Sequence, residues 1–176
     1  KPFKTHHNAL DKELFLRIAP ELYLKRLLVG GFEKVFEINR NFRNEGLSTI
    51  HNPEFTMLEF YEAYGTLDKT TNFVQKLVQD SISAVNESLS ITYEDRELDF
   101  KEDFEIKPLK KLVEEKLKTN LETEEQIFDV AKKNGLKVRK DWGWGKVLLE
   151  LFEEHVEKEL WKPTFVKDYP HEVSPL

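Results

Sequence analysis

Two neighbouring segments of alternating polarity constrain the fold of this chain most strongly. From Lys34 to Glu45 apolar side chains take every second position and polar ones lie between them, and Glu54 to Tyr64 repeats the pattern. Successive side chains of a β-strand point to opposite faces, so each segment predicts a strand with two unlike faces. The segment between them, residues 46–53, has the composition of a loop. Two strands joined by a loop of this length predict an antiparallel hairpin.

The two faces of this hairpin have different chemistry. We expect the apolar face to pack and the other face to bind ligands, because guanidinium forks hold phosphates or carboxylates, glutamates accept from amines, and aromatic rings stack on purines or cover ammonium groups. The alternative is a solvated face with cross-strand ion pairs. The apolar face holds Phe36, Ile38, Phe42, Leu58 and Phe60, and the other holds Glu37, Asn39, Asn41, Arg43, Glu45, Phe55, Met57, Glu59 and Tyr61.

The remaining pattern predicts an α+β fold. We expect three parts: a core over 1–106, a charge-rich helical insertion over 107–161, and a return strand over 162–176. Helices are predicted over residues 21–29, 66–86, 108–117, 123–134 and 146–160, and further strands over 15–18, 90–93, 96–99 and 164–169.

Composition excludes several classes of function. The net charge is −6 without a basic block, so the chain has no electrostatic footprint for a phosphate backbone. Because it has no cysteine, disulfides, thiolate zinc sites and cysteine nucleophiles are excluded. No apolar run is long enough for a membrane span, and the first residues are not those of a signal peptide, so we expect a cytoplasmic protein.

Two further patterns carry little weight. His6 and His7 are adjacent in an extended segment and should point to opposite faces, which argues against a shared metal ion. Gly143-Trp-Gly-Lys146 lacks the spacing of a phosphate-binding loop, and we expect it to be a turn that begins a helix.

The hairpin carries a recognisable motif. Phe42-Arg-Asn-Glu-Gly46, followed by His51-Asn-Pro-Glu-Phe-Thr56, resembles motif 2 of the class II aminoacyl-tRNA synthetases. The flanking residues resemble the bacterial lysine-specific members of subclass IIb, so that the likeness covers nearly the whole chain. These are residues 5–8, 16–26, 30–40, 163–165 and 169–175. The resemblance implies part of a catalytic domain built on an antiparallel β-sheet, with flanking helices and a helical insertion.

The resemblance also implies roles for individual residues. Arg43 would bridge the ATP α-phosphate and the carboxylate of L-lysine, where charge grows in the transition state. Of the other ATP-binding residues, Glu45 would recognise adenine, His51 would bind the γ-phosphate and Phe55 would stack on the adenine, with Asn52 in the same set. For lysine, Glu21 would hold the α-amino group, and Glu59 and Tyr61 the side-chain ammonium, which donates three hydrogen bonds.

Other family features are not found in the chain. The chain begins and ends as if cut from a larger protein, and motif 3 and the magnesium ligands are expected beyond Leu176, so no metal ligand is assigned. Motif 1, which builds the family's homodimer, and the domain that reads the tRNA(Lys) anticodon are expected before Lys1. We therefore expect this chain by itself to be inactive or nearly so, with exposed apolar patches.

Two rival functions stay open at this point. One is the related enzyme that attaches a lysine analogue to a translation elongation factor. The other is a noncatalytic binding module derived from a synthetase.

Overall fold

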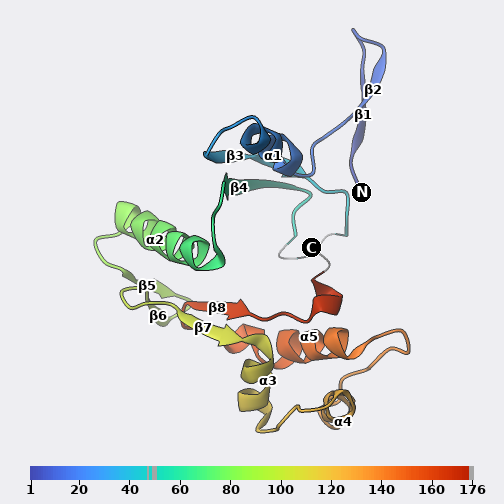
Figure 1. Ribbon diagram of the computed structural model, residues 1–176, viewed down its shortest axis with the longest axis vertical. Helices are drawn as coiled ribbons and strands as arrows, with labels where there is room; N and C mark the ends of the chain where they lie inside the picture. The colour runs from blue at the N-terminus through green and yellow to red at the C-terminus, as the bar shows by residue number, and fades with distance from the viewer. Residues whose placement is uncertain (47, 49–50, 175–176) are drawn as a thin grey trace. The chain divides into compact units, whose positions relative to one another are not determined.

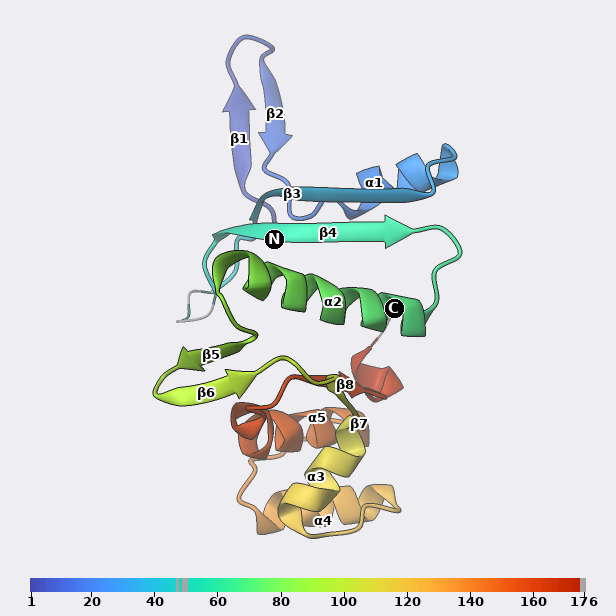
Figure 2. The same ribbon diagram turned by 90° about the vertical axis from the view of Figure 1, so that its left-hand side faces the viewer.

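The computed structural model describes residues 1–46, 48 and 51–174, and its contacts divide the chain into two compact units, Lys1–Leu67 and Asp68–Leu176. Helices and short strand pairs occur together (Figures 1 and 2), which confirms the predicted α+β class. The strands form four separate two-stranded sheets among the described residues. The predicted division at residues 106 and 161 stays a prediction, and residues 175 and 176 of the return segment lie outside the described residues.

Unit 1 consists of two antiparallel hairpins and one helix (Figure 1). The first hairpin pairs Lys4 with Phe15, whereas the second pairs Phe36 with Phe60 and ends at the pair of Phe42 and Glu54. The predicted strand over 15–18 is wrong, because the strand ends at Phe15. The elements are β1 (Lys4–His7), β2 (Lys12–Phe15), α1 (Glu21–Val29), β3 (Lys34–Phe42) and β4 (Glu54–Glu62).

Helix α1 begins and ends where the sequence predicts. Pro20 is the N-cap residue, which has no N–H group to leave unpaired at this end. At the other end the Gly30 N–H group donates to the Arg26 carbonyl at 2.9 Å. Gly31 follows with φ of 100°, a conformation that residues with a side chain rarely adopt. The chain thus turns from α1 directly into β3.

Strand β3 ends at Phe42, three residues before the predicted end at Glu45. The Arg43 N–H group still donates to the Pro53 carbonyl at 2.9 Å. Proline has no N–H group to return the second hydrogen bond, so the ladder cannot continue past this point. Arg43 and Glu45 therefore belong to the loop and not to the strand.

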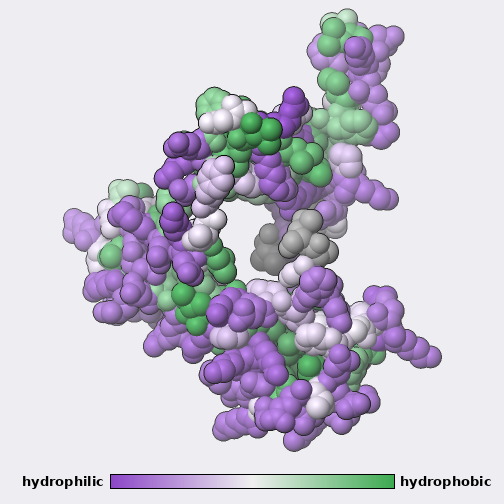
Figure 3. Space-filling model, viewed as in Figure 1, coloured by the Kyte–Doolittle hydropathy of each residue, from purple (hydrophilic) through white to green (hydrophobic). Residues whose placement is uncertain are grey.

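The pairing register confirms which side chains of β3 and β4 share a face, but the expectation about packing is wrong. Phe36 and Ile38 of the apolar face are 69% and 65% exposed, whereas Asn41 of the polar face is fully buried. The reason is that α1 lies on the polar face, where Lys25 covers the Tyr61 ring. Hydrophobic side chains accordingly occur at the surface, as Figure 3 shows in green, and the expected apolar exposure is present.

Unit 2 begins with a long helix and a short hairpin. Helix α2 (Leu67–Val85) is held to the segment that follows the hairpin, since the Gln75 side chain donates to Asp103 at 2.8 Å and accepts from the Phe104 N–H at 2.9 Å. The hairpin consists of β5 (Ser90–Tyr93) and β6 (Arg96–Asp99), as predicted. Its turn residues Glu94 and Asp95 have φ of 48° and 62°, the left-handed values that favour a tight hairpin.

The other strand pair of unit 2 is parallel, unlike the antiparallel sheet that the sequence predicts. Strand β7 (Glu105–Pro108) pairs with β8 (Thr164–Lys167). A parallel pair needs a long crossover, and the helical segment between the two strands provides it. That segment holds α3 (Leu109–Leu117), α4 (Glu124–Lys133), α5 (Trp144–His155) and the short helix η1 (Glu157–Glu159), and η2 (His171–Val173) follows β8.

The hydrophobic core lies between these helices. Its members come from one side of each helix, which is the spacing that an amphipathic helix buries. Thr123 caps α4 in a capping box with Gln126, as the predicted helix start there implies. Among the described residues no helix is long and apolar enough to cross a membrane. The core residues are Leu109, Leu112, Val113, Leu121, Ile127, Ala131, Val147, Leu148, Leu151, Phe152 and Val156.

Candidate active site

Three of the predicted lysine-binding residues meet on the polar face of the β3–β4 hairpin. The Tyr61 hydroxyl donates to Glu59 Oε1 at 2.5 Å. Burial, the hydrogen bond to Glu59 and the nearby charges of Glu59 and Glu21 together raise the pKa of Tyr61 well above its ordinary value. The phenol therefore stays a hydrogen-bond donor, and Glu59 stays an acceptor that can receive an ammonium group.

Glu21 reaches this cluster from the first turn of α1. Its Oε1 atom lies 2.5 Å from Lys25 Nζ, one helical turn further along. Lys25 Nζ in turn lies 5.4 Å from the centroid of the Tyr61 ring, which is cation–π range. The structure thus brings Glu21, Glu59 and Tyr61 together and adds Lys25, which the sequence analysis did not single out.

Glu37 adds a second carboxylate beside Glu59. The register places the two residues directly opposite each other, a like-charge pairing that destabilises a sheet when nothing compensates it. Arg17 compensates Glu37 through an ion pair of 2.6 Å. The Arg17 hydrogen bond, followed by a smaller contribution from the Asn39 amide, lowers the pKa of Glu37 below its ordinary value. The positive charge of Arg17 therefore reduces the electrostatic repulsion between Glu37 and Glu59.

Arg43 and Phe55, two of the predicted ATP-binding residues, are in contact. The Arg43 guanidinium carbon lies 5.1 Å from the centroid of the Phe55 ring. Its Nε donates weakly to the Ile18 carbonyl at 3.4 Å. A guanidinium held over a ring keeps its donors free for planar oxyanions, and it costs less entropy to fix than a free side chain. Arg43 is therefore oriented although it lies beyond the end of β3.

The other predicted ATP-binding residues lie in the loop between the two strands. Glu45, His51 and Asn52 are all exposed. His51 Nδ1 lies 2.8 Å from Ser48 Oγ, and the His51 N–H donates to the Ser48 carbonyl at 3.3 Å. These contacts shape the loop, but they do not bring the three side chains into the Arg43–Phe55 pair.

Asn41 is an unexpected member of the same face. It is the one fully buried polar residue among those described, and neither atom of its side-chain amide has a hydrogen-bond partner there. A buried amide without a partner costs stability, about 1–3 kcal/mol. The period-two pattern placed Asn41 on this face, but only the tertiary structure shows that it is buried.

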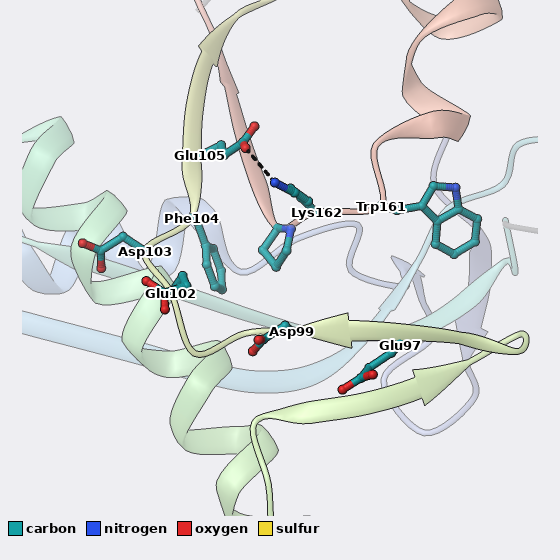
Figure 4. A pocket seen from close by; sticks show the side chains of 9 residues that line it. Glu97, Asp99, Glu102, Asp103, Phe104, Glu105, Trp161 and Lys162 are labelled. Carbon is teal, nitrogen blue, oxygen red and sulfur yellow. Dashed lines mark ion pairs between the residues drawn. The ribbon is translucent and has the colours of Figure 1, made fainter.

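A pocket in unit 2 holds none of these residues. This pocket of about 410 Å³ is shown in Figure 4. Two of its carboxylates have partners of their own: Glu105 pairs with Lys107 at 3.0 Å and with Lys162 at 3.6 Å, and Asp103 accepts from Gln75. An acidic recess of this kind indicates no ligand by itself. It is lined by Glu97, Asp99, Glu102, Asp103, Phe104, Glu105, Trp161, Lys162 and Pro163.

The two patterns that the sequence analysis set aside have structural roles. His6 pairs with Asp11 at 3.2 Å, and His7 Nδ1 accepts from the Leu10 N–H. The Glu172 carboxylate occupies the glycine turn before α5, where it accepts from the Gly145 N–H at 2.9 Å. A side chain on Gly145 would collide with Glu172, so this turn is filled by the protein itself.

No metal site is present among the described residues, since nowhere do three or more His, Cys, Asp or Glu side chains converge on one point. These residues therefore do not fit the magnesium that the resemblance implies.

Comparison with known proteins identifies the family of the chain. The family described as class II tRNA synthetases (D, K and N) matches residues 1–176, and the chain belongs to this family. Among its curated relatives are three lysine–tRNA ligases. The protein of Magnetococcus marinus is 52% identical, that of Carboxydothermus hydrogenoformans 50%, and that of Pseudomonas putida 51%. Each alignment covers the whole chain, which spans 36–37% of the length of these relatives.

Proposed function

We propose that this chain is the part of a lysine–tRNA ligase that binds L-lysine and ATP. The complete protein would activate lysine to lysyl-adenylate and transfer it to tRNA(Lys). The names of the relatives support this proposal, and so does one observation above all. Glu21, Glu59 and Tyr61, which would accept the two ammonium groups of lysine, lie together on the hairpin face that carries the Arg43–Phe55 pair.

In the proposed reaction the lysine carboxylate attacks the α-phosphorus of ATP, the new bond is a mixed anhydride, and pyrophosphate leaves. Negative charge grows on the oxygens of the α-phosphorus as the bond forms. A fixed guanidinium stabilises this charge more than it stabilises the ground state, and Arg43 supplies it. Phe55, whose ring now lies beneath Arg43, would also offer a stacking surface for adenine.

Lysine specificity would come from Glu59 and Tyr61. An ammonium group has three N–H donors and no acceptor, so an ionised carboxylate beside a phenol oxygen suits it. Glu21 would take the α-amino group. Glu45, His51 and Asn52 stay predicted ATP-binding residues.

A tRNA acceptor is favoured over an elongation factor because the cited relatives are lysine–tRNA ligases. We propose magnesium as a cofactor of the complete enzyme, a homodimer as its assembly and the cytoplasm as its location. These three points rest on the family alone.

The decisive experiment is lysine-dependent ATP–pyrophosphate exchange by the full-length protein that contains this chain, followed by charging of tRNA(Lys). Exchange without tRNA charging, but with lysylation of an elongation factor, would favour the first rival. Absence of any lysine-dependent exchange would favour a noncatalytic module. The isolated chain should show little or no exchange, so a rate near that of the full-length protein would contradict the prediction of inactivity.

A further inference from the structure

We infer that Lys25 acts as an internal cation that occupies Glu21 and competes with the α-amino group of the substrate. The inference rests on the proposed function, in which Glu21 holds that α-amino group. It adds a residue that sets the affinity and the selectivity for lysine without contacting lysine itself.

The first support is the position of the Lys25 ammonium. Its Nζ lies 2.5 Å from Glu21 Oε1 and 5.4 Å from the centroid of the Tyr61 ring. If Lys25 pointed into solvent, it would contact only Glu21 within its own helix and would not reach the hairpin. Lys25 instead lies between the carboxylate proposed for the α-amino group and the ring proposed for the side-chain ammonium.

The second support is the unequal state of the two carboxylates. Glu59 accepts a hydrogen bond from the neutral Tyr61 hydroxyl, and none of the ion pairs among the described residues includes it. Glu21 already has a cation. The site therefore has one carboxylate open to an ammonium group and one that must first give up Lys25.

The third support is that Lys25 can leave. The side chains of Lys25 and Glu21 are 50% and 43% exposed, so both water and a ligand can reach the pair. An exposed ion pair between residues i and i+4 of a helix is weak, worth about a factor of two in equilibrium. The lysine stem has four rotatable bonds, and its ammonium is well solvated outside the site.

These observations give an order to binding. The side-chain ammonium of the substrate enters at the open Glu59, and its α-amino group then displaces Lys25 from Glu21. A ligand that has a side-chain ammonium but no α-amino group gains nothing from the second step. Lys25 therefore lowers the affinity for lysine more than the affinity for such an analogue.

The test compares L-lysine with 6-aminohexanoate, which lacks the α-amino group, by calorimetric titration of the full-length protein that contains this chain. For Lys25→Met we expect the Kd for lysine to fall and the ratio of the 6-aminohexanoate Kd to the lysine Kd to rise about twofold. Lys25→Arg keeps the charge and should keep the wild-type ratio. Lys76→Met is the matched control, because Lys76 makes the same kind of pair with Asp80, at 3.0 Å, on α2.

The Kd ratio in Lys25→Met shows whether Lys25 competes with the substrate. An unchanged ratio in Lys25→Met means that the pair is an ordinary surface ion pair and overturns the inference, and so does weaker lysine binding, which would mean that Lys25 positions Glu21. Lys25→Gln replaces Lys25→Met if the methionine variant does not fold. If the wild-type protein binds no lysine, the proposed function fails and this inference fails with it, whereas lysine binding with an unchanged ratio overturns this inference alone.

Discussion

The guanidinium of Arg43 lies over the Phe55 ring at 5.1 Å, although the first residue follows β3 and the second belongs to β4. Beyond the point where Pro53 ends the strand ladder, this contact orients the Arg43 side chain. It fixes the residue proposed to stabilise the transition state by means of the residue proposed to stack on adenine. The proposed positions of the α-phosphate and of the adenine therefore depend on the same pair of side chains.

The first prediction concerns the planar fork of Arg43. Arg43→Lys keeps a positive charge but loses bidentate geometry and the guanidinium contact with Phe55, so lysine-dependent pyrophosphate exchange by the full-length protein should fall about a hundredfold. Arg40→Lys is the control, because Arg40 lies on the opposite face, where it pairs with Glu54 at 3.4 Å. Equal losses in both variants would contradict the assignment of Arg43.

The second prediction concerns the Phe55 ring. Phe55→Leu keeps an apolar side chain but removes the stacking surface, and base–aromatic stacking is worth about 1–3 kcal/mol. We expect the KM for ATP in the same assay to rise about five- to a hundredfold, with a smaller change in the KM for lysine. Phe36→Leu, at an exposed position on the opposite face, should leave both constants unchanged. A larger change for lysine than for ATP would refute the stacking role.

The third prediction concerns the Tyr61 hydroxyl. Tyr61→Phe keeps the ring under Lys25 but removes the donor to Glu59, and hydrogen bonds to charged groups contribute about 1.5–3 kcal/mol. The KM for lysine should rise about ten- to a hundredfold while the KM for ATP stays unchanged, as steady-state exchange kinetics would show. Tyr64→Phe is the control, since Tyr64 is 98% exposed. An unchanged KM for lysine would mean that Glu59 needs no orienting partner.

Much of this site follows from the sequence, for a physical reason. A strand has a period of two, so the pattern from Lys34 onward is enough to place Glu37, Asn39 and Asn41 on one face, and the pairing register agrees. The residues of the motif likewise fall on that hairpin. These are local properties, which the order of residues determines directly.

The parts that the sequence did not predict depend on contacts between distant segments. Periodicity distinguishes two faces but not which of them a helix covers, so the burial of Asn41 and the exposure of Phe36 were not predictable from it. The end of β3 depends on Pro53, eleven residues after Phe42. Lys25 was not predicted at all, because only the contact of α1 with the hairpin shows that this lysine reaches both Glu21 and Tyr61.

The fourth prediction concerns the buried amide of Asn41. Asn41→Leu removes two buried polar atoms without partners, so unit 1 should gain about 1 kcal/mol in free energy of unfolding. The three tryptophans, Trp142, Trp144 and Trp161, all lie in unit 2, so hydrogen exchange of the β3 and β4 amides is the suitable measurement. Asn44→Leu, at an exposed position, should change exchange little. Faster exchange in Asn41→Leu would show that the amide has a partner in solution.

The fifth prediction concerns the carboxyl of Glu37 and the loss of folding stability at acidic pH. The Arg17 hydrogen bond lowers the pKa of Glu37 in the folded state, so as the pH falls the unfolded chain takes up the proton first. The contribution of Glu37 is therefore complete above its ordinary pKa of 4.5 and is lost as the pH falls through the lower folded value. Glu37→Gln should make the β3 and β4 amides exchange faster at neutral pH, and the difference from wild type should shrink as the pH falls from about 5 to about 3. The comparison needs exchange rates corrected for their intrinsic dependence on pH.

Glu54→Gln serves as the control, because its ion pair with Arg40 is longer, 3.4 Å, and lies on the opposite, exposed face. A difference between Glu37→Gln and wild type that stays constant over this range would mean that Arg17 does not stabilise the ionised Glu37.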